Sequence, residues 1–175
     1  AKIHVQKEYI MWYAILGAVL LAGDQILKYW VVTHLAVGES APFLPGFMQL
    51  TRLHNYGAAW SSLSGRTVLL VVFTAVLLAA VALLLIKKVV RHWTGITACT
   101  LILSGGIGNI IDRIVHGYVV DMFDLQLFSY PVFNLADCCV VVGAILGGIY
   151  YLFLYEKYDK KKKEPDHAHD PSDPS

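Results

Sequence analysis

Residues 67–86 read TVLLVVFTAVLLAAVALLLI, which is twenty residues without a single charged side chain. A helix of about 20 apolar residues crosses the hydrocarbon core of a bilayer, and inside lipid the backbone must satisfy its own hydrogen bonds. This stretch therefore predicts a transmembrane helix. The composition of the 175-residue chain agrees, because 57% of its residues are hydrophobic, only 15% are charged and the mean hydropathy is +0.56.

Three more apolar stretches lie on either side of this one, at residues 10–35, 93–111 and 138–155. The first contains Asp24 and Lys28, but no signal-peptide cleavage site and no soluble domain follow it, so we expect a retained helix. With residues 67–86, the sequence predicts four transmembrane helices. We expect them to form a single integral membrane domain over residues 1–155, followed by a basic, disordered cytoplasmic tail over residues 156–175, whose last part, residues 164–175, is polar and Pro-rich.

Lys and Arg residues are distributed unevenly between the two sides of the four crossings. Most of the 14 lie in the N-terminal segment, in the link between the second and third helices, and in the tail. Because basic residues favour the cytoplasmic side, both termini are expected in the cytoplasm and loops 36–66 and 112–136 on the outer face. These basic residues are Lys2, Lys7, Lys87, Lys88, Arg91, Lys157, Lys160, Lys161, Lys162 and Lys163.

Charge and cysteine content exclude two other classes of protein. A net charge of +1 argues against a nucleic-acid-binding protein, which usually carries a large basic surplus. The three cysteines do not suggest a disulfide framework, because Cys99 lies in an apolar stretch and the neighbouring Cys138 and Cys139 cannot bridge without strain.

The two outer loops contain segments rich in strand-forming residues. Residues 47–54 and residues 118–123 have this composition. A small antiparallel sheet resting on the membrane surface would pair them. The expected fold is therefore a mainly α membrane protein with four transmembrane helices and a small extracytoplasmic antiparallel β-cradle.

Ionisable residues gather near the outer ends of the helices. Asp24 and Lys28 are four residues apart, so they share a helix face and can pair; the pair either orients the helix or belongs to a functional site. Asn109 shares a face with Asp112 and Arg113. These two form either a water-facing helix end or part of a carboxylate network held by the guanidinium group.

Two further aspartates lie in or beside the second outer loop. Asp121 follows two valines, and Asp137 lies three residues after Asn134 at the start of the fourth apolar stretch. Asn134 and Asp137 fit the N-cap and the acidic partner of a capping box. Capping and catalysis are compatible, because a helix start fixes the backbone of Asp137 and leaves its side chain at the membrane boundary.

Several kinds of membrane hydrolase lack the residues they need here. The sequence contains no His-Glu-x-x-His metal motif, and neither Ser104 nor the cysteines have a suitably placed His. Carboxylates remain, and two that share a proton can activate a water and protonate a leaving amine without a metal or an organic cofactor. The candidates are Asp24, Asp112, Asp121, Asp124 and Asp137.

Five motifs, in order, resemble the bacterial lipoprotein signal peptidases, or signal peptidase II. They are DQILK at 24–28, NYGAAW at 55–60, GNIIDR at 108–113, GYVVD at 117–121 and FNLAD at 133–137. The sequence has Trp60 where the family often has Phe, and its segment between the last two motifs is short for the family.

The resemblance implies that the membrane domain over residues 1–155 is an aspartic endopeptidase of the bacterial cytoplasmic membrane, with its active site on the outer face. Its substrates would be diacylglyceryl-modified prolipoproteins, cut on the N-terminal side of the lipidated Cys, and globomycin-type inhibitors would occupy the same site. The family's catalytic pair maps onto Asp121 and Asp137. Its supporting polar residues map onto Asp24, Lys28, Asn55, Asn109, Arg113 and Asn134.

Two other functions remain open from the residues alone. A small transporter or channel could use Asp24, Lys28 and Asp137 as an ion path, but it predicts polar residues continuing into the cytoplasmic half of the bundle. A structural or chaperone-like membrane subunit predicts that Asp121 and Asp137 can be replaced without effect on lipoprotein maturation.

Overall fold

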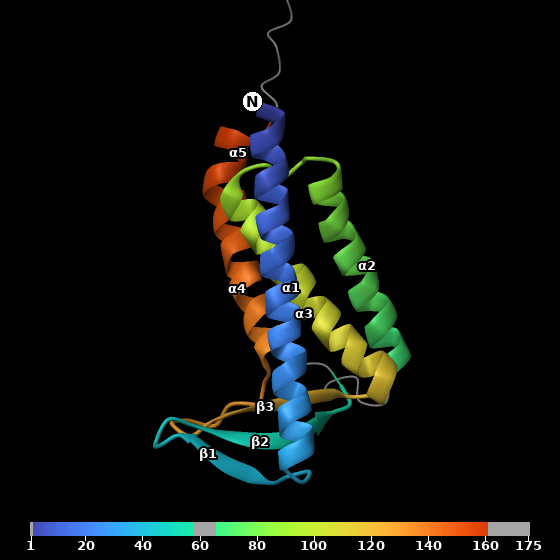
Figure 1. Ribbon diagram of the computed structural model, residues 1–175, viewed down its shortest axis with the longest axis vertical. Coiled ribbons are helices and arrows are strands. Elements are labelled where there is room, and N and C mark those ends of the chain that lie inside the picture. Colours follow the sequence, from blue (N-terminus) through green and yellow to red (C-terminus); the bar gives the residue numbers. More distant parts are fainter. Residues whose placement is uncertain (1, 58–65, 161–175) are drawn as a thin grey trace, which may run out of the picture.

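The computed structural model describes residues 2–57 and 66–160, with side chains described from Ile10 onward in the first helix. Within these residues, four helices are long and apolar enough to cross a membrane. They lie along one long axis, and a small sheet covers one end (Figure 1). The prediction of four transmembrane helices and a small sheet is confirmed. The proposed domain boundary near residue 155 stays a prediction, because residues 161–175 lie outside the described residues.

The helices extend further than hydropathy alone predicts. The third runs to His116, beyond the apolar stretch that ends at residue 111, and the fourth begins at Leu135, directly after the predicted N-cap Asn134. Asp112 and Asp137, which lie in these added turns, have hydrogen-bond partners in the fold. The helices are α1 (Lys2–His34), α2 (Thr67–Ile86), α3 (Trp93–His116), α4 (Leu135–Ile149), the π-helical turn η2 (Tyr150–Leu154) and α5 (Tyr155–Tyr158).

Helix α3 is the central element of the bundle. It contacts α1, α2 and α4, and about half of its membrane-spanning window is buried. Small residues allow this close packing. A Cβ atom on Gly105 would collide with the backbone carbonyl of Ala136 at the start of α4, and one on Gly108 would lie 2.7 Å from Asp24 Oδ2. These two glycines therefore bring α4 and α1 close to the same end of α3.

The sheet contains three antiparallel strands in the order β1 (Ser40–Leu44), β2 (Met48–Asn55) and β3 (Val119–Leu125). β2 and β3 correspond to the two predicted strands, and they pair antiparallel as expected. β1 is an additional edge strand, which the sequence analysis missed. It contains Pro42, and proline is tolerated at a sheet edge, where an amide hydrogen bond is not required.

The sheet is fastened to the end of α1. Val31 of α1 and Leu35, the residue that follows α1, pack against Val120 and Met122 of β3 in a small buried core. Arg52 of β2 donates hydrogen bonds of 2.9 Å from Nη1 to the carbonyl oxygens of Val32, in the last turn of the helix, and of Leu35 just beyond it, where carbonyls lack partners within the helix. Strand β3 is thereby fixed over the helix ends.

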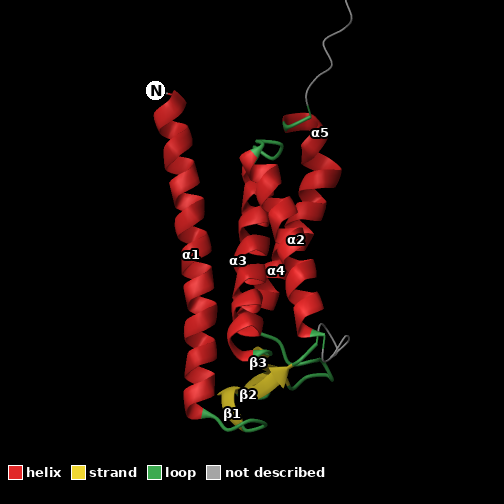
Figure 2. Ribbon diagram, turned by 90° about the vertical axis from the view of Figure 1, so that its right-hand side faces the viewer, coloured by secondary structure: helices red, strands yellow, loops and turns green. Residues whose placement is uncertain are grey.

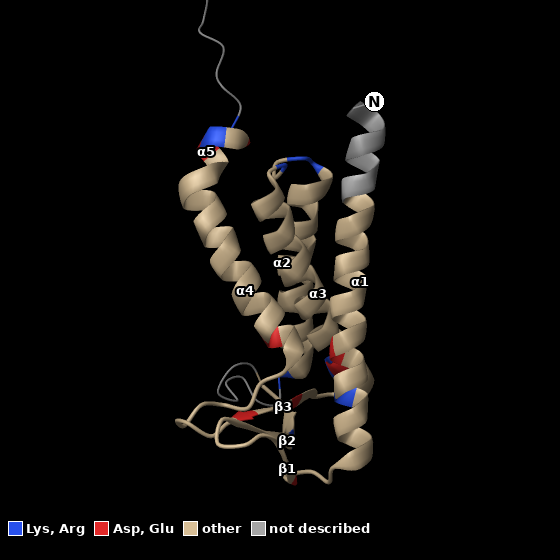
Figure 3. Ribbon diagram, turned by 60° about the vertical axis from the view of Figure 1, so that its left-hand side comes forward, with Lys and Arg blue, Asp and Glu red and all other residues tan. Residues whose placement is uncertain are grey.

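The opposite end of the bundle is closed by a buried carboxylate. Asp159 is 7% exposed and accepts hydrogen bonds from the amides of Arg91 and His92 and, at 2.6 Å, from Tyr150 Oη. It joins the α2–α3 link to the last turns of the chain that the structure describes. Lys and Arg residues lie at this end, in the link and in α5 (Figure 3).

Candidate functional site

A buried ion cluster joins α1 to α3 beneath the sheet. Lys28 Nζ lies 2.8 Å from Asp24 Oδ2 and 3.0 Å from Asp112 Oδ2, and all three residues are almost fully buried. The predicted Asp24–Lys28 pair is therefore present. Asp112 is not a water-facing helix end, because it is the second anion of this cluster. One ammonium group therefore contacts two carboxyl groups inside the fold.

Gln25 and the amide of Val120 complete the contacts of the two carboxylates. Gln25 Nε2 donates to Asp24 Oδ2 and Asp112 Oδ1, each at 3.2 Å. The amide of Val120 donates to Asp112 Oδ2 at 3.0 Å, which attaches α3 to β3 one residue before Asp121. The sequence analysis left Asp112 open between a water-facing helix end and a carboxylate network, and it gave Gln25 no role beyond its place in the DQILK motif.

The ion cluster fixes the orientation of the Asn109 side chain. Lys28 Nζ can only donate, and it donates at 3.0 Å to Asn109 Oδ1. The amide nitrogen of Asn109 is therefore turned the other way, and it donates at 2.8 Å to Asp137 Oδ1. The positive charge of Lys28 is linked to Asp137 through one oriented amide.

The Asn134 side chain is oriented in a similar way, with its amide nitrogen directed at Asp121. Its Oδ1 accepts a hydrogen bond from the amide of Asp137 at 2.8 Å, so its nitrogen points away from that helix start. This nitrogen donates to Asp121 Oδ1 at 2.7 Å and to Asn109 Oδ1 at 3.2 Å. The predicted capping box is confirmed, because Asp137 Oδ2 accepts from the amide of Asn134. Asn134 therefore caps α4 and also links both carboxylates.

Asn55 at the end of β2 and Arg113 of α3 complete the site on the other side of Asp121. Asn55 Nδ2 donates at 3.0 Å to Asp121 Oδ2. Asn55 Oδ1 accepts from the amide of Gly57, and Arg113 Nη2 donates at 2.9 Å to the carbonyl oxygen of Gly57. The segment that follows β2 is thus held against α3, beside Asp121.

Asp121 and Asp137 line one cavity of about 440 Å³ at the end of the bundle near the sheet. Asn55, Asn109 and Arg113 line it too, and apolar residues of α2, α4 and the 130–133 segment form its other walls. Each carboxylate oxygen of the two aspartates accepts one hydrogen bond from a neighbouring Asn and retains a further lone pair. A small polar group inside the cavity can therefore be held by both side chains.

Burial changes the acidity of Asp121, which is 1% exposed. Desolvation disfavours its charged form, the nearby charge of Asp137 acts in the same direction, and together they raise the pKa of Asp121 to about 7. The hydrogen bonds from Asn55 and Asn134 and the charge of Lys28 oppose this shift without cancelling it. Asp121 can therefore exchange a proton near neutral pH.

The structure brings all eight sequence-predicted site residues together at the sheet end of the bundle. The other candidates lie outside the cavity. Asp124 accepts hydrogen bonds from Gln49 and Thr51 across the sheet, and the Ser104 hydroxyl donates to the carbonyl of Thr100 in its own helix. Among the described residues, no group of three or more His, Cys, Asp or Glu side chains could hold a metal ion. Cys99, Cys138 and Cys139 are free.

The fold and the site together define a multi-pass membrane protein with two aspartates, Asp121 buried and Asp137 half-buried, at one end of its bundle. Comparison with known proteins gives the family. Residues 16–153 match the family model described as signal peptidase (SPase) II. The chain therefore belongs to the signal peptidase II family of aspartic peptidases.

Individual relatives agree with this assignment. The lipoprotein signal peptidase of Enterococcus faecalis is 41% identical over 151 residues, which cover 86% of this chain and 93% of that protein. That of Lactococcus lactis is 38% identical over 143 residues, covering 82% and 91%. A solved structure titled as a bacterial membrane enzyme at 2.3 Å resolution is 34% identical, with a TM-score of 0.77 and coverage of 89% and 95%.

Proposed function

We propose that the chain removes signal peptides from prolipoproteins, with Asp121 and Asp137 as its catalytic pair. The observation that carries this proposal is the shared cavity, in which both carboxylates are held by oriented Asn side chains and keep free lone pairs. Asp24, Lys28, Asn55, Asn109, Arg113 and Asn134 support them through the contacts described above.

The chemistry needs one proton shared between the two aspartates and one water molecule between them. The raised pKa of Asp121, about 7, allows the pair to hold one proton near neutral pH; we assign this proton at rest to Asp121 and the role of base to Asp137. Asp137 takes a proton from the water as the water oxygen attacks the scissile carbonyl, and Asp121 gives its proton to the carbonyl oxygen. As the C–N bond breaks, Asp137 gives the proton it took from the water to the departing amine, and Asp121 takes back a proton from one hydroxyl group of the tetrahedral intermediate. The products are a carboxylic acid and an amine, and both aspartates return to their starting states.

The substrate is a prolipoprotein with a diacylglyceryl group on its lipobox Cys, cut on the N-terminal side of that Cys. The lipid anchors the scissile bond at the membrane surface, where the cavity lies beneath the sheet, and positioning of this kind supplies a large part of catalysis. Globomycin-type inhibitors occupy the same cavity. Lys and Arg residues gather at the end opposite the sheet, which supports cytoplasmic termini and a cavity on the outer face of the cytoplasmic membrane.

The test is cleavage by the purified protein of two forms of one precursor, with and without the diacylglyceryl group. We expect the modified precursor to lose its signal peptide and the mass of the product to place the cut before the lipidated Cys. Equal cleavage of both forms, or a cut elsewhere, would overturn the assigned substrate.

A further inference from the structure

A second and larger cavity begins at the other end of the bundle and extends along α1 and α3 as far as Leu21 and Ile107, without sharing a lining residue with the cavity of the two aspartates. It has a volume of about 880 Å³ and opens between the N-terminal half of α1 and helices α2 and α3. Figure 2 shows α1 standing apart from α3 along this half. Its walls are almost entirely apolar and include Ala14 and Ala18 of α1, Leu85 of α2, and Ile96 and Leu103 of α3.

Few contacts hold α1 to the bundle along this cavity. Gly17 lies close to Ser104 and Thr100 of α3, and Tyr13 Oη donates a weak hydrogen bond of 3.4 Å to the carbonyl of Trp93. The strong contacts of α1 are at its other end, where Asp24, Gln25 and Lys28 lie. An occupant of the cavity would therefore supply packing that α1 lacks.

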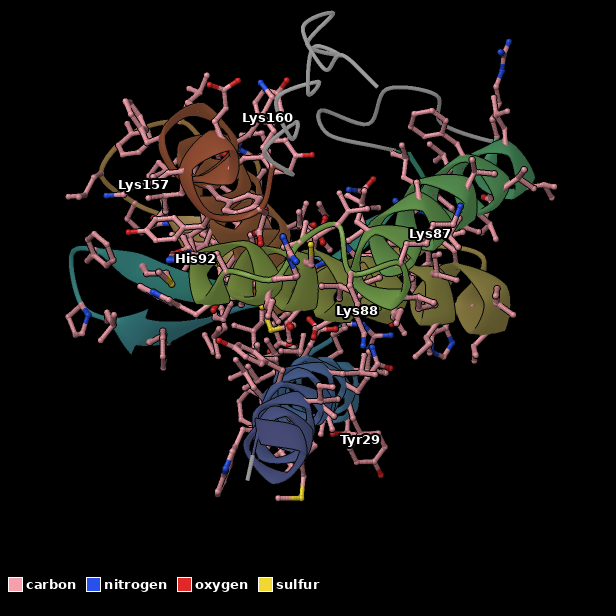
Figure 4. All side chains as sticks on the ribbon, turned by 90° about the horizontal axis from the view of Figure 1, so that it is seen from above. Tyr29, Lys87, Lys88, His92, Lys157 and Lys160 are labelled. Atoms are coloured by element: carbon pink, nitrogen blue, oxygen red, sulfur yellow. The ribbon has the colours of Figure 1, made fainter. Side chains whose placement is uncertain are left out.

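The mouth of this cavity is cationic. Lys88 and Arg91 line it at the α2–α3 link. Lys88 is exposed and forms no ion pair with any residue whose side chain the structure describes. Arg91 is paired with Asp159 through Nε, but its side chain is still 52% exposed. In the view from above, Lys88 lies on the side of the link that faces α1, whereas Lys87 lies over α2 (Figure 4).

The backbone at Lys88 provides an independent observation. Lys88 follows the end of α2 with φ of 53°, and it is the one non-glycine residue with positive φ in the described ranges. This position after a helix usually carries glycine, because a side chain adds strain there. The charge of Lys88 suits the C-terminal end of α2, and its place at the cavity mouth makes it available to a negatively charged group there.

The size of the cavity indicates what it can hold. A cavity of about 880 Å³ with apolar walls has room for a flexible hydrocarbon chain, which can follow its shape. A helix with its side chains is rigid and about 10 Å across, so it adapts to such a cavity less well.

We propose that this cavity binds one anionic phospholipid from the leaflet at the Lys/Arg-rich end, with its phosphate at Lys88 and Arg91 and an acyl chain between α1 and α3. Charge complementarity at the mouth and apolar packing in the walls account for both parts of the ligand. The site is separate from the catalytic pair, so the lipid-binding proposal can be tested independently of the proposed peptidase mechanism.

Native mass spectrometry of the full chain tests this proposal with phosphatidylglycerol and phosphatidylcholine carrying the same acyl chains. We expect one phosphatidylglycerol to be retained in preference to phosphatidylcholine. Removing one basic side chain at a membrane surface should weaken anionic lipid binding about fivefold. Lys88→Gln and Lys88→Gly should both show this loss. Lys88→Gly also guards against misfolding, because glycine suits the positive φ.

Lys87→Gln is the matched control, since it removes the same charge from the neighbouring residue, and it should keep the lipid preference. Equal retention of both lipids, or equal losses in Lys87→Gln and Lys88→Gln, would overturn the proposal. A photo-reactive residue in place of Ala14 adds a direct measurement: a crosslink to phosphatidylglycerol supports the assignment, and a crosslink to an added signal peptide contradicts it.

Discussion

Asp121→Asn is expected to stabilise the protein against unfolding, and the gain should depend on pH. The pKa of Asp121 is about 7 in the folded protein and 3.8 for an exposed Asp. The folded protein therefore holds a proton that the unfolded chain releases between these pH values. The free energy of unfolding must fall as the pH rises from about 4 to about 7.

The structure gives the size of this effect. The pKa of Asp121 differs by about three units between the folded and unfolded states, which corresponds to roughly 4 kcal/mol above pH 7. An Asn side chain has nearly the shape of a protonated Asp and cannot ionise. The free energy of unfolding of the variant should match that of the wild type near pH 4 and exceed it by up to that amount at pH 8. The gain is reduced by the hydrogen bonds with Asn55 and Asn134 that the new amide cannot form.

The assay is thermal or denaturant unfolding of the purified protein in one detergent at pH 5 and pH 8. Asp124→Asn provides the same chemical change on the same strand, outside the cavity. If Asp121→Asn shifts stability equally at both pH values, or lowers it more at pH 8, the burial argument for Asp121 is wrong.

Three other predictions concern the support of the site. Lys28→Met should lower the free energy of unfolding by about 3–5 kcal/mol, because it leaves two buried carboxylates without a cation. Adding Asp112→Asn should recover part of this loss. Unfolding measurements would contradict the prediction if the double variant were less stable than Lys28→Met alone. Gly105→Val should reduce both stability and cleavage, because the valine side chain would collide with the Ala136 carbonyl at the start of α4. Wild-type activity of this variant would show that the close approach of α3 and α4 is not required. Asn109→Ala should leave the protein folded but lower kcat by 10-fold or more, because Asp137 loses the hydrogen bond that the Asn109 amide donates to it. A change in KM alone would contradict this and assign Asn109 to substrate binding.

The sequence alone predicted the parts of the structure that depend on local pattern. Residues 67–86 have the length and hydropathy of a membrane helix, and Asp24 with Lys28 have the spacing of a helical ion pair. Asn134 and Asp137 have the spacing of a capping box. The structure contains all three features. Each depends on residues a few positions apart, where helix geometry fixes the distance.

The parts that were missed depend on contacts between distant segments. Asp112 meets Lys28 across 84 positions of sequence, and nothing near Asp112 indicates that it is buried. Gln25 was read only as part of a motif, although it bridges Asp24 and Asp112. The edge strand β1 contains a proline, which argues locally against a strand. Tertiary packing decides all of these cases.

The account depends most on Asp121 and Asp137 acting together on one peptide bond. The most direct measurement is single-turnover cleavage of a diacylglyceryl-modified precursor by the purified Asp121→Asn and Asp137→Asn variants, with Asp124→Asn as the control and unfolding curves to show that each is folded. We predict that each of the first two loses at least 1,000-fold in cleavage rate, roughly the cost of removing a group that acts as part of a unit, while the control cleaves normally. A folded Asp121→Asn or Asp137→Asn variant that cleaves at a rate near that of the wild type would contradict the account.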